Sequence, residues 1–486
     1  MNRAHVIDWP AEADDALPLA LWSAREIAEA TGGLASGDFL VSGVAFDSRE
    51  VGEGDLFVAL KGETTDGHHH VAGALERGAA AALVSQGVPG PHVLVPDSFA
   101  ALEALARAAR MRTPARIIGV TGSVGKTSVK EALFAALDRA SHGAAHRSLK
   151  SYNNHVGVPL SLARMPARSR FGIFEMGMNH AGEIAGLTAL VRPHVAVVTA
   201  IAPAHIEMLG SEEAIADAKA EIFTGLVPGG TAIVPADSAH HARLRAAARD
   251  CGAQVVSFGR SDAAEVRLLD AVAGAGGTLV TIDMGDRRLC YTVAAPGEHW
   301  VLNSLAVMAA VRAVGGDLGA AGLALAELAG MQGRGARHRV RVPAGGEALL
   351  IDESYNANPA SMRATIAALG ETPARRRIAI LGAMKELGDF GPALHAALAA
   401  PLADAGVDFA LLVGAEMAPL ADELGKAGAQ PLAGAVAFAH CADVDEARAA
   451  LATFGLAKGD AILVKGSNAV GLARLVAALL EHADGS

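Results

Sequence analysis

Cysteine is scarce in this sequence, with only three among 486 residues. Cys251, Cys290 and Cys441 lie far apart and form no C-x-x-C pair. The sequence therefore predicts neither a disulfide scaffold nor a zinc site, and this usage fits a reducing cytosol. Aromatic residues are also few, at 4%. The core must then be built mainly from alanine, leucine and valine.

A surplus of positive charge is missing as well. The chain carries 41 lysine and arginine residues against 52 aspartate and glutamate residues, a net charge of −11. Proteins that bind nucleic acid usually carry a basic surplus, so we expect no nucleic-acid partner. Charged residues at 19% and hydrophobic residues at 51% exclude a disordered chain.

Long apolar runs are absent too. No uninterrupted run reaches the ~18 apolar residues that predict a membrane-spanning helix. Residues 1–21 contain Asp8, Glu12, Asp14 and Asp15. A signal peptide would instead begin with basic residues followed by an apolar stretch. We therefore expect a cytoplasmic protein without a membrane span.

The chain does contain strand–helix alternation, in three segments. A length of 486 residues predicts about three domains. Composition changes near residues 110–114 and 331–335. We therefore predict a smaller N-terminal α/β domain at 1–113, a central domain at 114–331 and a C-terminal doubly wound α/β domain at 332–486. Continuous apolar strands between helices indicate mostly parallel sheets in the last two domains.

The expected elements follow these apolar runs. We predict helices at 24–31, 71–77, 99–110, 128–140 and 212–223. Residues 254–293 alternate around glycine turns and predict an antiparallel patch. We predict strands at 40–45, 56–60, 81–84, 92–95, 117–121, 172–176, 195–199, 231–234, 349–352, 378–382, 410–414 and 462–465.

A glycine-rich loop lies between the strand at 117–121 and the helix that follows it. This strand–loop–helix context predicts a P-loop, in which backbone N–H groups and the helix N-terminus bind phosphates. Lys126 would add charge at the terminal phosphates, and the Thr127 hydroxyl could bind Mg²⁺. Val120 stands where the strict pattern has glycine. We expect nucleotide contacts from Thr121, Gly122, Ser123, Val124, Gly125, Lys126, Thr127 and Ser128.

Other nucleotide motifs are not found. The sequence has no Asn-Lys-x-Asp, so a guanine-specific switch is not indicated. Gly119, Gly122 and Gly125 have the wrong spacing for a dinucleotide-binding G-x-G-x-x-G.

Several polar residues near the strand ends could complete the site. Glu175 ends a strand of the P-loop sheet and could reach Mg²⁺, and His205 follows the next strand at the same edge. On the residues alone, Glu175 could equally be an ordinary loop acid, and a lone histidine such as His205 is more often structural than a ligand. Lys219 could be an ordinary solvated helix lysine. In the run of histidines at 68–70, only His68 is a candidate ligand contact.

A basic run at 334–341 allows two interpretations. It is either a solvated linker or a source of arginines directed at ATP phosphates from the third domain. The arginines are Arg334, Arg337, Arg339 and Arg341.

Taken together, these motifs resemble the Mur ligase family, the ATP-dependent amide-forming enzymes of peptidoglycan synthesis. The resemblance runs from about residue 43 to 470. It rests on five stretches of sequence: 47–49 with 54–62, 121–127, 153–159, 175–183 and 350–362. The last stretch, with 381–388, is most similar to family members that join D-alanyl-D-alanine to UDP-N-acetylmuramoyl-tripeptide.

The resemblance implies roles for individual residues. It implies contacts to the UDP end of the substrate from the regions of Ser48, Lys61, Asp66 and His68. It implies ATP and Mg²⁺ in the central domain, with Lys126, Lys219 and His205 as catalytic residues. The implied metal site contains Thr127, Glu175, His205 and Lys219, the last as a carbamylated lysine.

The remaining implied contacts involve both substrates. Asn153 and Asn154 would lie near the acceptor carboxylate, and Asn303 near adenine. Arg334 and Asp352 would contact the phosphate and ribose of ATP. The implied contacts to the incoming dipeptide are Tyr355, Asn356 and Asn358, and Lys465 is a further substrate contact. Three positions depart from the family's pattern: Trp300, Lys385 and Asn468.

The implied reaction passes through an acyl phosphate, which the amine of the dipeptide then attacks. We expect the enzyme to be a monomer. Two neighbouring activities remain open: addition of the third amino acid by another ligase of the family, and phosphorylation of a small-molecule hydroxyl by a P-loop kinase. A nucleotide-dependent switch protein is a third possibility, with slow hydrolysis and no ligation.

Overall fold

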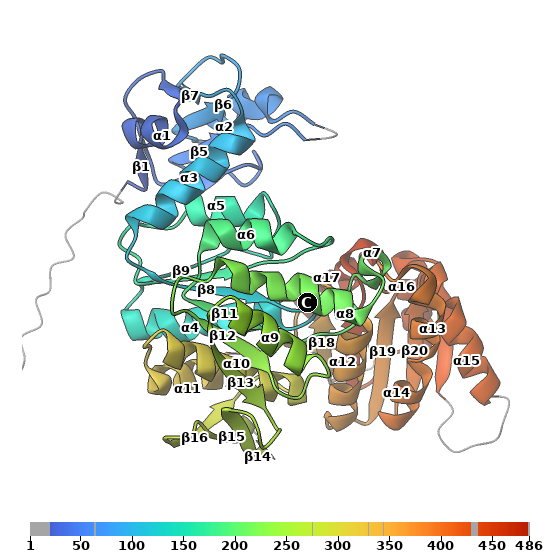
Figure 1. Cartoon of the computed structure of the whole chain (residues 1–486). Coiled ribbons are helices and arrows are strands. Elements are labelled where there is room, and N and C mark those ends of the chain that lie inside the picture. The colour runs from blue at the N-terminus through green and yellow to red at the C-terminus, as the bar shows by residue number, and fades with distance from the viewer. Residues whose placement is uncertain are drawn as a thin grey trace, which may run out of the picture. The chain divides into compact units, whose positions relative to one another are not determined.

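Strands and helices alternate through the described chain, which confirms the predicted α/β class (Figure 1). The computed structural model describes residues 20–62, 65–274, 276–328, 330–343, 345–428 and 436–484. Asp8, Glu12, Asp14 and Asp15 lie outside these residues. By their contacts the residues divide into two units, 1–114 with 159–167 and 115–158 with 168–486. The predicted domain boundaries at 113/114 and 331/332 stay predictions.

The first unit is built on a five-stranded sheet with the order β2-β7-β6-β5-β4, in which only β2 is antiparallel to its neighbour. Its strands are β2 (Leu34–Ala35), β4 (Gly43–Ala45), β5 (Asp55–Val58), β6 (Ala81–Val84) and β7 (His92–Leu94). A separate pair joins β1 (Trp22–Ser23) to β3 (Leu40–Val41). The single strand predicted at 40–45 is therefore wrong, because its two halves pair in different sheets.

Two α-helices of the first unit start at clear capping residues. α1 (Ala24–Thr31) begins after Ser23, which forms a reciprocal capping box with Glu26. α3 (Ser98–Arg112) begins after Asp97, whose carboxylate accepts the N–H groups of Phe99 and Ala100. The unit also contains η1 (Gly67–His70) and α2 (Val71–Glu76).

The first unit also includes a later stretch of chain. Residues 159–167, with most of α5 (Gly157–Ala163), belong to it. The Trp22 indole N–H donates to the Ala163 carbonyl at 2.8 Å, and the Arg112 guanidinium lies 3.3 Å from the centre of the Trp22 ring. Arg112 also donates to the Met165 carbonyl at 3.4 Å. The unit is thus assembled from two separate segments of sequence.

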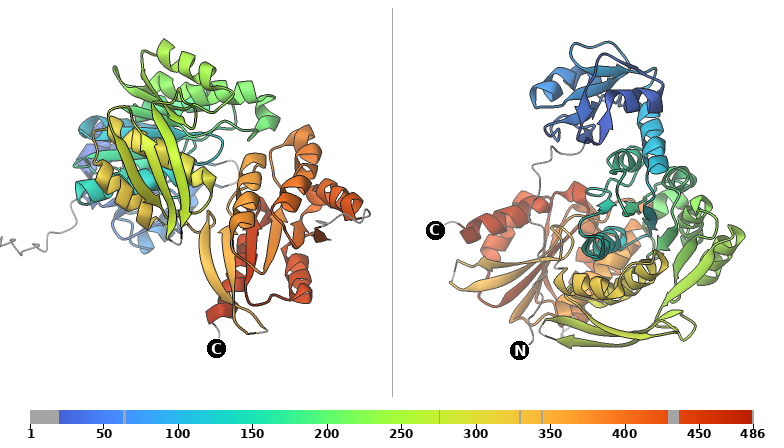
Figure 2. Two further views of the ribbon diagram at one scale, coloured as in Figure 1. Left: turned by 90° about the horizontal axis from the view of Figure 1, so that it is seen from below. Right: turned by 90° about the vertical axis from the view of Figure 1, so that its left-hand side faces the viewer.

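The second unit contains a nine-stranded sheet with the order β16-β15-β14-β13-β12-β11-β8-β10-β9. Its first six strands in sequence are parallel: β8 (Arg116–Thr121), β9 (Ala145–Arg147), β10 (Phe171–Glu175), β11 (Val195–Val198), β12 (Thr231–Pro235) and β13 (Gln254–Gly259). The antiparallel strands are β15 (Gly277–Asp283) and β16 (Arg288–Val293), which follow β14 (Val266–Gly274) (Figure 2). The predicted antiparallel patch is thus wrong at its start, since β13 pairs in parallel with both neighbours.

Helices cover both faces of this sheet. Ile118 and Val120 of β8 face a buried core shared with α4 (Lys126–Ser141), α10 (Glu298–Ala313) and α11 (Leu318–Glu327). Gly119 points to the opposite face, where an added Cβ would lie 2.5 Å from Met176 and 3.4 Å from Ile222. The other helical segments are α6 (Glu183–Val191), α7 (Ile206–Leu209), α8 (Glu212–Ala220), η2 (Glu221–Gly225) and α9 (His241–Asp250).

A six-stranded sheet follows, with the order β17-β18-β22-β19-β20-β21. Only the edge strand β17 (Ala336–Arg341) is antiparallel. The linker interpretation is thus wrong for Arg337, Arg339 and Arg341, which lie on β17. The other strands are β18 (Glu347–Glu353), β19 (Arg376–Gly382), β20 (Phe409–Val413), β21 (Ala437–Cys441) and β22 (Asp460–Lys465).

The helices around this sheet complete the doubly wound arrangement. They include short 3-10 turns at Gly388–Phe390 (η3), Ala415–Met417 (η4) and Asn468–Val470 (η5). The α-helices are α12 (Pro359–Glu371), α13 (Gly391–Ala396), α14 (Ala399–Asp404), α15 (Ala418–Gly428), α16 (Val444–Phe454) and α17 (Ala473–Asp484). No described helix is both long and apolar enough to cross a bilayer.

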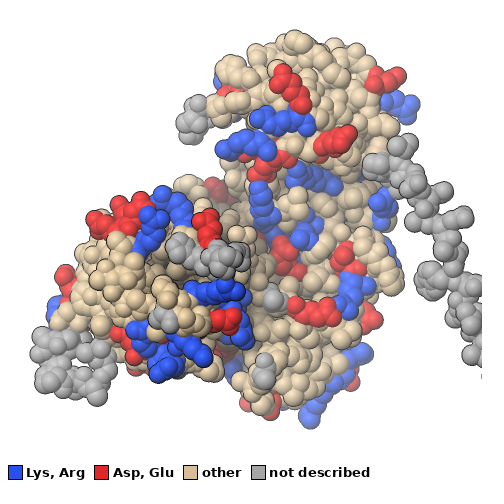
Figure 3. Space-filling view, turned by 180° about the vertical axis from the view of Figure 1, so that it is seen from behind, with Lys and Arg blue, Asp and Glu red and all other residues tan. Residues whose placement is uncertain are grey.

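Charges of both signs are interspersed on the surface. On the face drawn in Figure 3, groups of lysine and arginine side chains lie beside aspartate and glutamate side chains. Ion pairs such as Arg339–Glu347 on β17 and β18 are part of this pattern. The absence of a nucleic-acid partner stays a prediction.

Candidate active site

The phosphate loop has the backbone that its glycines require. Gly122 and Gly125 have φ values of +147° and +84°, a region that side chains disfavour. A Cβ on Gly122 would lie 2.0 Å from the Thr199 hydroxyl, and one on Gly125 would lie 2.8 Å from the Asn303 amide. Both glycines are therefore fixed by conformation and by space.

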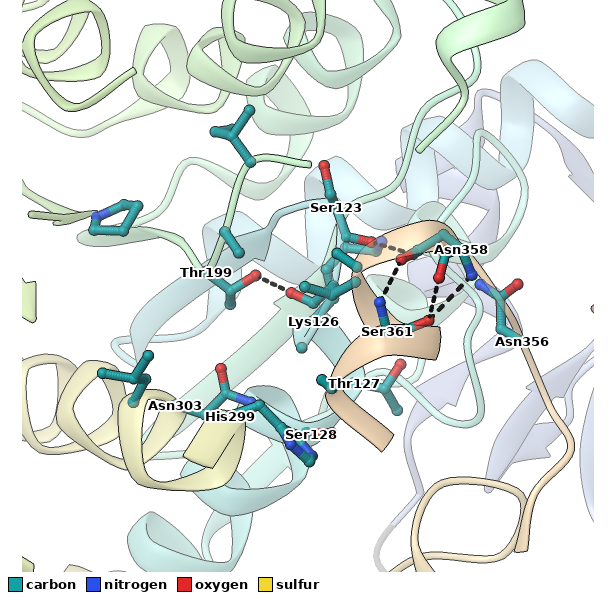
Figure 4. Close-up of a pocket in the computed structure, with 18 of the residues that line it drawn as sticks. Ser123, Lys126, Thr127, Ser128, Thr199, His299, Asn303, Asn356, Asn358 and Ser361 are labelled. Atoms are coloured by element: carbon teal, nitrogen blue, oxygen red, sulfur yellow. Dashed lines mark hydrogen bonds between the residues drawn. The ribbon is translucent and has the colours of Figure 1, made fainter. Parts of the chain in front are cut away.

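Contacts from the segment after β11 and from the start of α4 hold this loop in place (Figure 4). The Ser123 hydroxyl donates to the Ala202 carbonyl at 2.8 Å, and the Thr199 hydroxyl donates to the Val124 carbonyl. At the start of α4, the Lys126 ammonium donates to the Gly122 carbonyl at 2.8 Å. Burial lowers the pKa of Lys126, and Arg334 acts in the same direction, whereas Glu175 opposes the shift.

Glu175 lies at the carboxyl end of β10, beside the P-loop, and only 1% of it is exposed. Its carboxylate accepts the Thr127 hydroxyl at 2.8 Å on one oxygen and the Asn153 amide N–H at 2.8 Å on the other. The structure thus brings together three of the predicted side chains. Carboxylate, hydroxyl and amide oxygens are the ligand types that Mg²⁺ prefers, so this cluster fits the ion.

Lys219 lies near the C-terminus of α8 and is 1% exposed, so the solvated-lysine interpretation is wrong. Burial and the charge of Lys126 hold its pKa well below the usual lysine value. No hydrogen bond or ion pair of its ammonium is found within the described part of the chain. A buried lysine without a hydrogen-bond or charge partner among the described residues, and with a lowered pKa, is unusual for a structural lysine.

His205 follows β11, as predicted, and has a left-handed backbone with φ of 61°. Its Nδ1 lies 2.5 Å from a carboxylate oxygen of Glu386. This contact is the largest cause that lowers the pKa of Glu386. His205 lines the same cavity as the P-loop.

Residues around the start of β17 supply another wall of the cavity. The Arg334 guanidinium lies 4.3 Å from the centre of the Tyr355 ring and donates to the Ser151 hydroxyl at 3.2 Å. Asp352 does not line the cavity. Its carboxylate accepts the Gly333 N–H at 2.7 Å and the Ser354 hydroxyl at 2.6 Å. Asp352 therefore fixes the turn that carries Arg334, and its contact to ATP stays a prediction.

The segment after β18 brings its asparagines to the P-loop side of the cavity. Asn358 caps α12 and donates to the Ser123 carbonyl at 3.4 Å. The buried Lys465 ammonium donates to the Asn356 carbonyl at 2.9 Å and lies 3.4 Å from the Glu353 carboxylate. Asn154 lies outside the cavity lining, where its side chain accepts the N–H groups of Val156 and Gly157 at the start of α5.

The cavity has a volume of about 710 Å³. Of the residues predicted in the central and C-terminal segments, it collects Ser123, Val124, Gly125, Lys126, Thr127, Ser128, Asn153, Glu175, His205, Asn303, Arg334, Tyr355, Asn356, Asn358 and Lys465. Besides Asp352 and Asn154, its lining omits Thr121, Gly122 and Lys219.

Part of the lining was not predicted. One group consists of Pro235, Asp237, Phe258 and His299, together with the buried Trp300. Pro235 and Phe258 end or nearly end parallel strands, a position at which ligands collect in α/β folds. That signal could have identified them. Ser151, Thr199 and Glu353 also line the cavity and carry no recognisable sequence pattern.

Besides Trp300, two positions depart from the family's pattern, Lys385 and Asn468, and neither lines the cavity. Lys385 forms an ion pair with Glu416. Asn468 begins η5, and no function follows from its contacts.

The residues predicted to bind UDP lie in the first unit. Lys61 and Asp66 form an isolated bridge, and Ser48 is partly exposed. His68 is buried, with Nδ1 2.6 Å from the Asp66 carboxylate and Nε2 accepting the Ser85 N–H at 2.9 Å. Both ring nitrogens are therefore engaged within the unit. Contacts of these four residues to a ligand stay predictions.

Comparison with known proteins covers nearly the whole chain. The Mur ligase family, catalytic domain, matches residues 40–111, the Mur ligase middle domain 120–311, and the Mur ligase, glutamate ligase domain, 338–468. The chain is 36% identical to a UDP-N-acetylmuramoyl-tripeptide–D-alanyl-D-alanine ligase of Synechocystis over 92% of this chain and 93% of that protein. It is 35% identical to the ligase of that name from Escherichia coli, over 79% and 83%.

Solved structures agree with this relationship. A crystal structure of MurF from Acinetobacter baumannii matches with a TM-score of 0.82 and 30% identity, over 96% of this chain and 100% of that one. MurF ligase from Thermotoga maritima, in complex with ADP, matches with a TM-score of 0.74 and 27% identity, over 91% and 98%. On these matches to all three domains, and on relatives aligned along almost its full length, the chain belongs to the Mur ligase family.

Proposed function

We propose that this protein is an ATP-dependent ligase that joins D-alanyl-D-alanine to UDP-N-acetylmuramoyl-tripeptide in peptidoglycan precursor synthesis. One structural observation carries the proposal: a single cavity is lined by both the P-loop and the segment of Tyr355, Asn356 and Asn358. A ligase of this kind needs phosphoryl transfer and amine capture in one place. The names of the relatives supply the substrate pair.

The P-loop residues fit activation of the tripeptide carboxylate by ATP. A carboxylate is a poor acyl donor until its oxygen is phosphorylated. Lys126 and the N–H groups at the start of α4 are placed to neutralise charge on the transferring phosphate. Arg334, held by Ser151 and Tyr355, would add a second positive charge.

We propose that Thr127, Glu175 and His205 hold Mg²⁺. Bound there, the ion would stabilise negative charge on the transferring phosphate. Thr127 and Asn153 orient Glu175 by bonding one carboxylate oxygen each. Asn153 thereby also fixes the loop that we expect to receive the tripeptide carboxylate.

We also propose that Lys219 is carbamylated. Reaction with CO₂ requires the neutral amine, which its burial favours. The product is an anion with oxygen donors, suited to Mg²⁺. ¹³C-labelled bicarbonate should therefore give a carbamate resonance in the protein and none in Lys219→Ala. A resonance unchanged in that variant would assign it to another amine.

The test of the overall function is a panel of substrates. ADP release is measured with UDP-muramoyl peptides of different length, each combined with single amino acids or with D-alanyl-D-alanine. We expect release only with the tripeptide and the dipeptide together. Activity with a dipeptide-length acceptor and one amino acid would indicate a ligase that adds the third residue. ADP release without free phosphate would indicate a kinase.

We further propose a cytoplasmic, monomeric enzyme, which fits nucleotide-linked substrates made inside the cell. Analytical ultracentrifugation of the full chain should give a single species near the 49.2 kDa chain mass. A stable dimer would contradict this.

A further inference from the structure

Four acidic side chains line the cavity, and three of them are already engaged. Glu175 accepts a bond on each oxygen. Asp237 accepts the N–H groups of Arg260 and Ser261, again one on each oxygen. Glu212 lies 3.5 Å from His240, with 44% of its side chain exposed to solvent. The fourth is Glu353.

Glu353 differs from the other three because it keeps an available oxygen. Only 14% of its side chain is exposed, and its Oε2 lies 3.4 Å from the Lys465 ammonium. No partner of Oε1 is found among the residues that the structure describes. A carboxylate that is mostly buried, close to one cation and otherwise unpaired is poised to accept a proton or a hydrogen bond.

The fold places the Glu353 carboxylate at the carboxyl ends of the parallel strands of the six-stranded sheet. Glu353 is the last residue of β18, and its direct neighbour in the register is Lys465, the last residue of β22. The charged or titratable groups facing it are Lys465 from β22 and His299 from α10, and Arg334, from the turn before β17, acts on Lys465. Tyr355 and Asn356, expected near the dipeptide, follow two and three residues later.

We propose that Glu353 is the general base that takes the proton from the attacking amine of the dipeptide. This assignment rests on the proposed ligase function. The amine enters in its neutral form, and its lone pair forms the N–C bond to the acyl carbon. One N–H bond breaks, and the proton passes to a Glu353 oxygen. The C–O bond to phosphate then breaks, and its electron pair leaves with the phosphate.

The ordinary basicity of a carboxylate is sufficient for this role. A free α-amino group has a pKa of about 7.7–8.0, well above that of a glutamate. Once the nitrogen has begun to bond to carbon, however, its remaining protons become strongly acidic. Lys465 lies 3.4 Å from one oxygen of this carboxylate and is its direct neighbour on the adjoining strand, so it fixes where the carboxylate stands. A positioned base of this kind typically contributes about 10²–10⁴-fold to the rate.

The test exchanges the nucleophile. Hydroxylamine is largely neutral at neutral pH and attacks acyl phosphates without a base. With ATP and UDP-N-acetylmuramoyl-tripeptide, Glu353→Gln should lose about 10²–10⁴-fold in kcat with D-alanyl-D-alanine. It should still form the hydroxamate at a rate within a few-fold of wild type. Glu347→Gln, on the exposed part of the same strand, is the matched control and should change neither reaction.

Two results would overturn the assignment. Equal losses in both reactions would show that Glu353 only supports the structure or the phosphoryl step. Full ligation by Glu353→Gln would show that no base is needed there. In either case wild-type ligation would leave the proposed function intact, whereas a wild-type protein that ligates no substrate pair would refute that function itself.

A second variant covers the case in which the amide variant does not fold. Glu353→Ser leaves space for a small carboxylate. Added formate or acetate should raise its rate with D-alanyl-D-alanine several-fold and leave hydroxamate formation unchanged. No rescue in a folded Glu353→Ser protein would count against the base.

Discussion

Helices α4 and α8 each bury a lysine, and the two lysines have opposite surroundings. Lys130 of α4 is 0% exposed, and its ammonium donates to the carbonyls of Ser148 and Lys150 and pairs with Glu131 at 3.0 Å. Lys219 of α8 is 1% exposed and has no such partner among the described residues. Its pKa is lowered well below the ordinary value.

The difference shows that burial alone does not identify a functional lysine. Lys130 uses its charge to hold the chain between β9 and α5 in place, and it also lies 3.9 Å from the Glu175 carboxylate, so the contacts that it makes explain its burial. Lys219 is in a position that costs stability and gains no contact in return. Such a cost persists in a protein when the group serves the reaction. The following variants test this contrast.

The largest effect is expected from Lys126, whose charge also lowers the pKa of Lys219. Lys126→Ala removes the cation at the start of α4, and ligation should fall by at least about 10²–10³-fold. The fold should remain, because among the described residues the ammonium donates a hydrogen bond only to its own loop. Product formation and circular dichroism measure the two outcomes. Near wild-type ligation would refute the P-loop assignment.

The second effect is loss and rescue at Lys219. Lys219→Ala removes the proposed anion and should lower activity by at least about 10–100-fold, the range seen when support of a metal site is lost. Added acetate or propionate should restore part of the rate. Lys219→Arg keeps a positive charge and should stay inactive under both conditions. A fully active Lys219→Ala enzyme would refute the proposed carbamate but would not contradict the ligase assignment.

The third effect appears in stability. Lys130→Met removes the hydrogen bonds that its ammonium donates to the Ser148 and Lys150 carbonyls, which should cost about 1–3 kcal/mol in the free energy of unfolding. Denaturant titration measures it, with the exposed Lys426→Met as the matched control. Added carboxylate should change the activity of Lys130→Met no more than it changes the activity of the wild type. If acetate restored the activity of Lys130→Met, the proposed difference between a structural Lys130 and a functional Lys219 would be contradicted.

The smallest expected effect is a gain in the free energy of unfolding, whereas Lys130→Met should lower it. In CO₂-free buffer, Lys219→Met should be slightly more stable than wild type near neutral pH, by about 1 kcal/mol. Because the folded-state pKa of Lys219 is lowered, the unfolded chain binds more protons between that pKa and the usual lysine value of about 10.4. Wild-type stability should therefore rise with pH through this window, and the gap to Lys219→Met should close. A gap that widens with pH would contradict the lowered pKa.

The sequence placed the P-loop, Glu175 and His205 at or after the ends of continuous apolar strands, and the family resemblance implied the roles of Glu175 and His205. Position relative to a strand is local information, and parallel strands bring such ends to one edge. The burial of Lys219 could not be predicted in this way, because α8 has no strong apolar face in its sequence and the charge of Lys126 that acts on Lys219 comes from a distant segment.

Non-local pairing explains the errors. β17 forms an edge strand because it pairs with β18. The sequence of residues 336–341 alone does not indicate that pairing. Likewise, Ser42 separates β3 from β4 only because β1 and β5 lie in different sheets. Glu353 was not predicted as a site residue for a related reason. A glutamate beside an aspartate has no distinguishing pattern until Lys465 is placed next to it.

The indole bond from Trp22 to Ala163 has a consequence for the order of synthesis. Residues 159–167 complete the first unit, so the N-terminal segment cannot finish folding when residue 114 leaves the ribosome. It must wait until β8 and α4 of the other unit have also emerged. A fragment that stops at residue 114 would lack the acceptor of the Trp22 indole and the Met165 carbonyl that binds Arg112. For expression of this unit alone, the useful design is therefore a fusion that supplies residues 159–167 through a short linker.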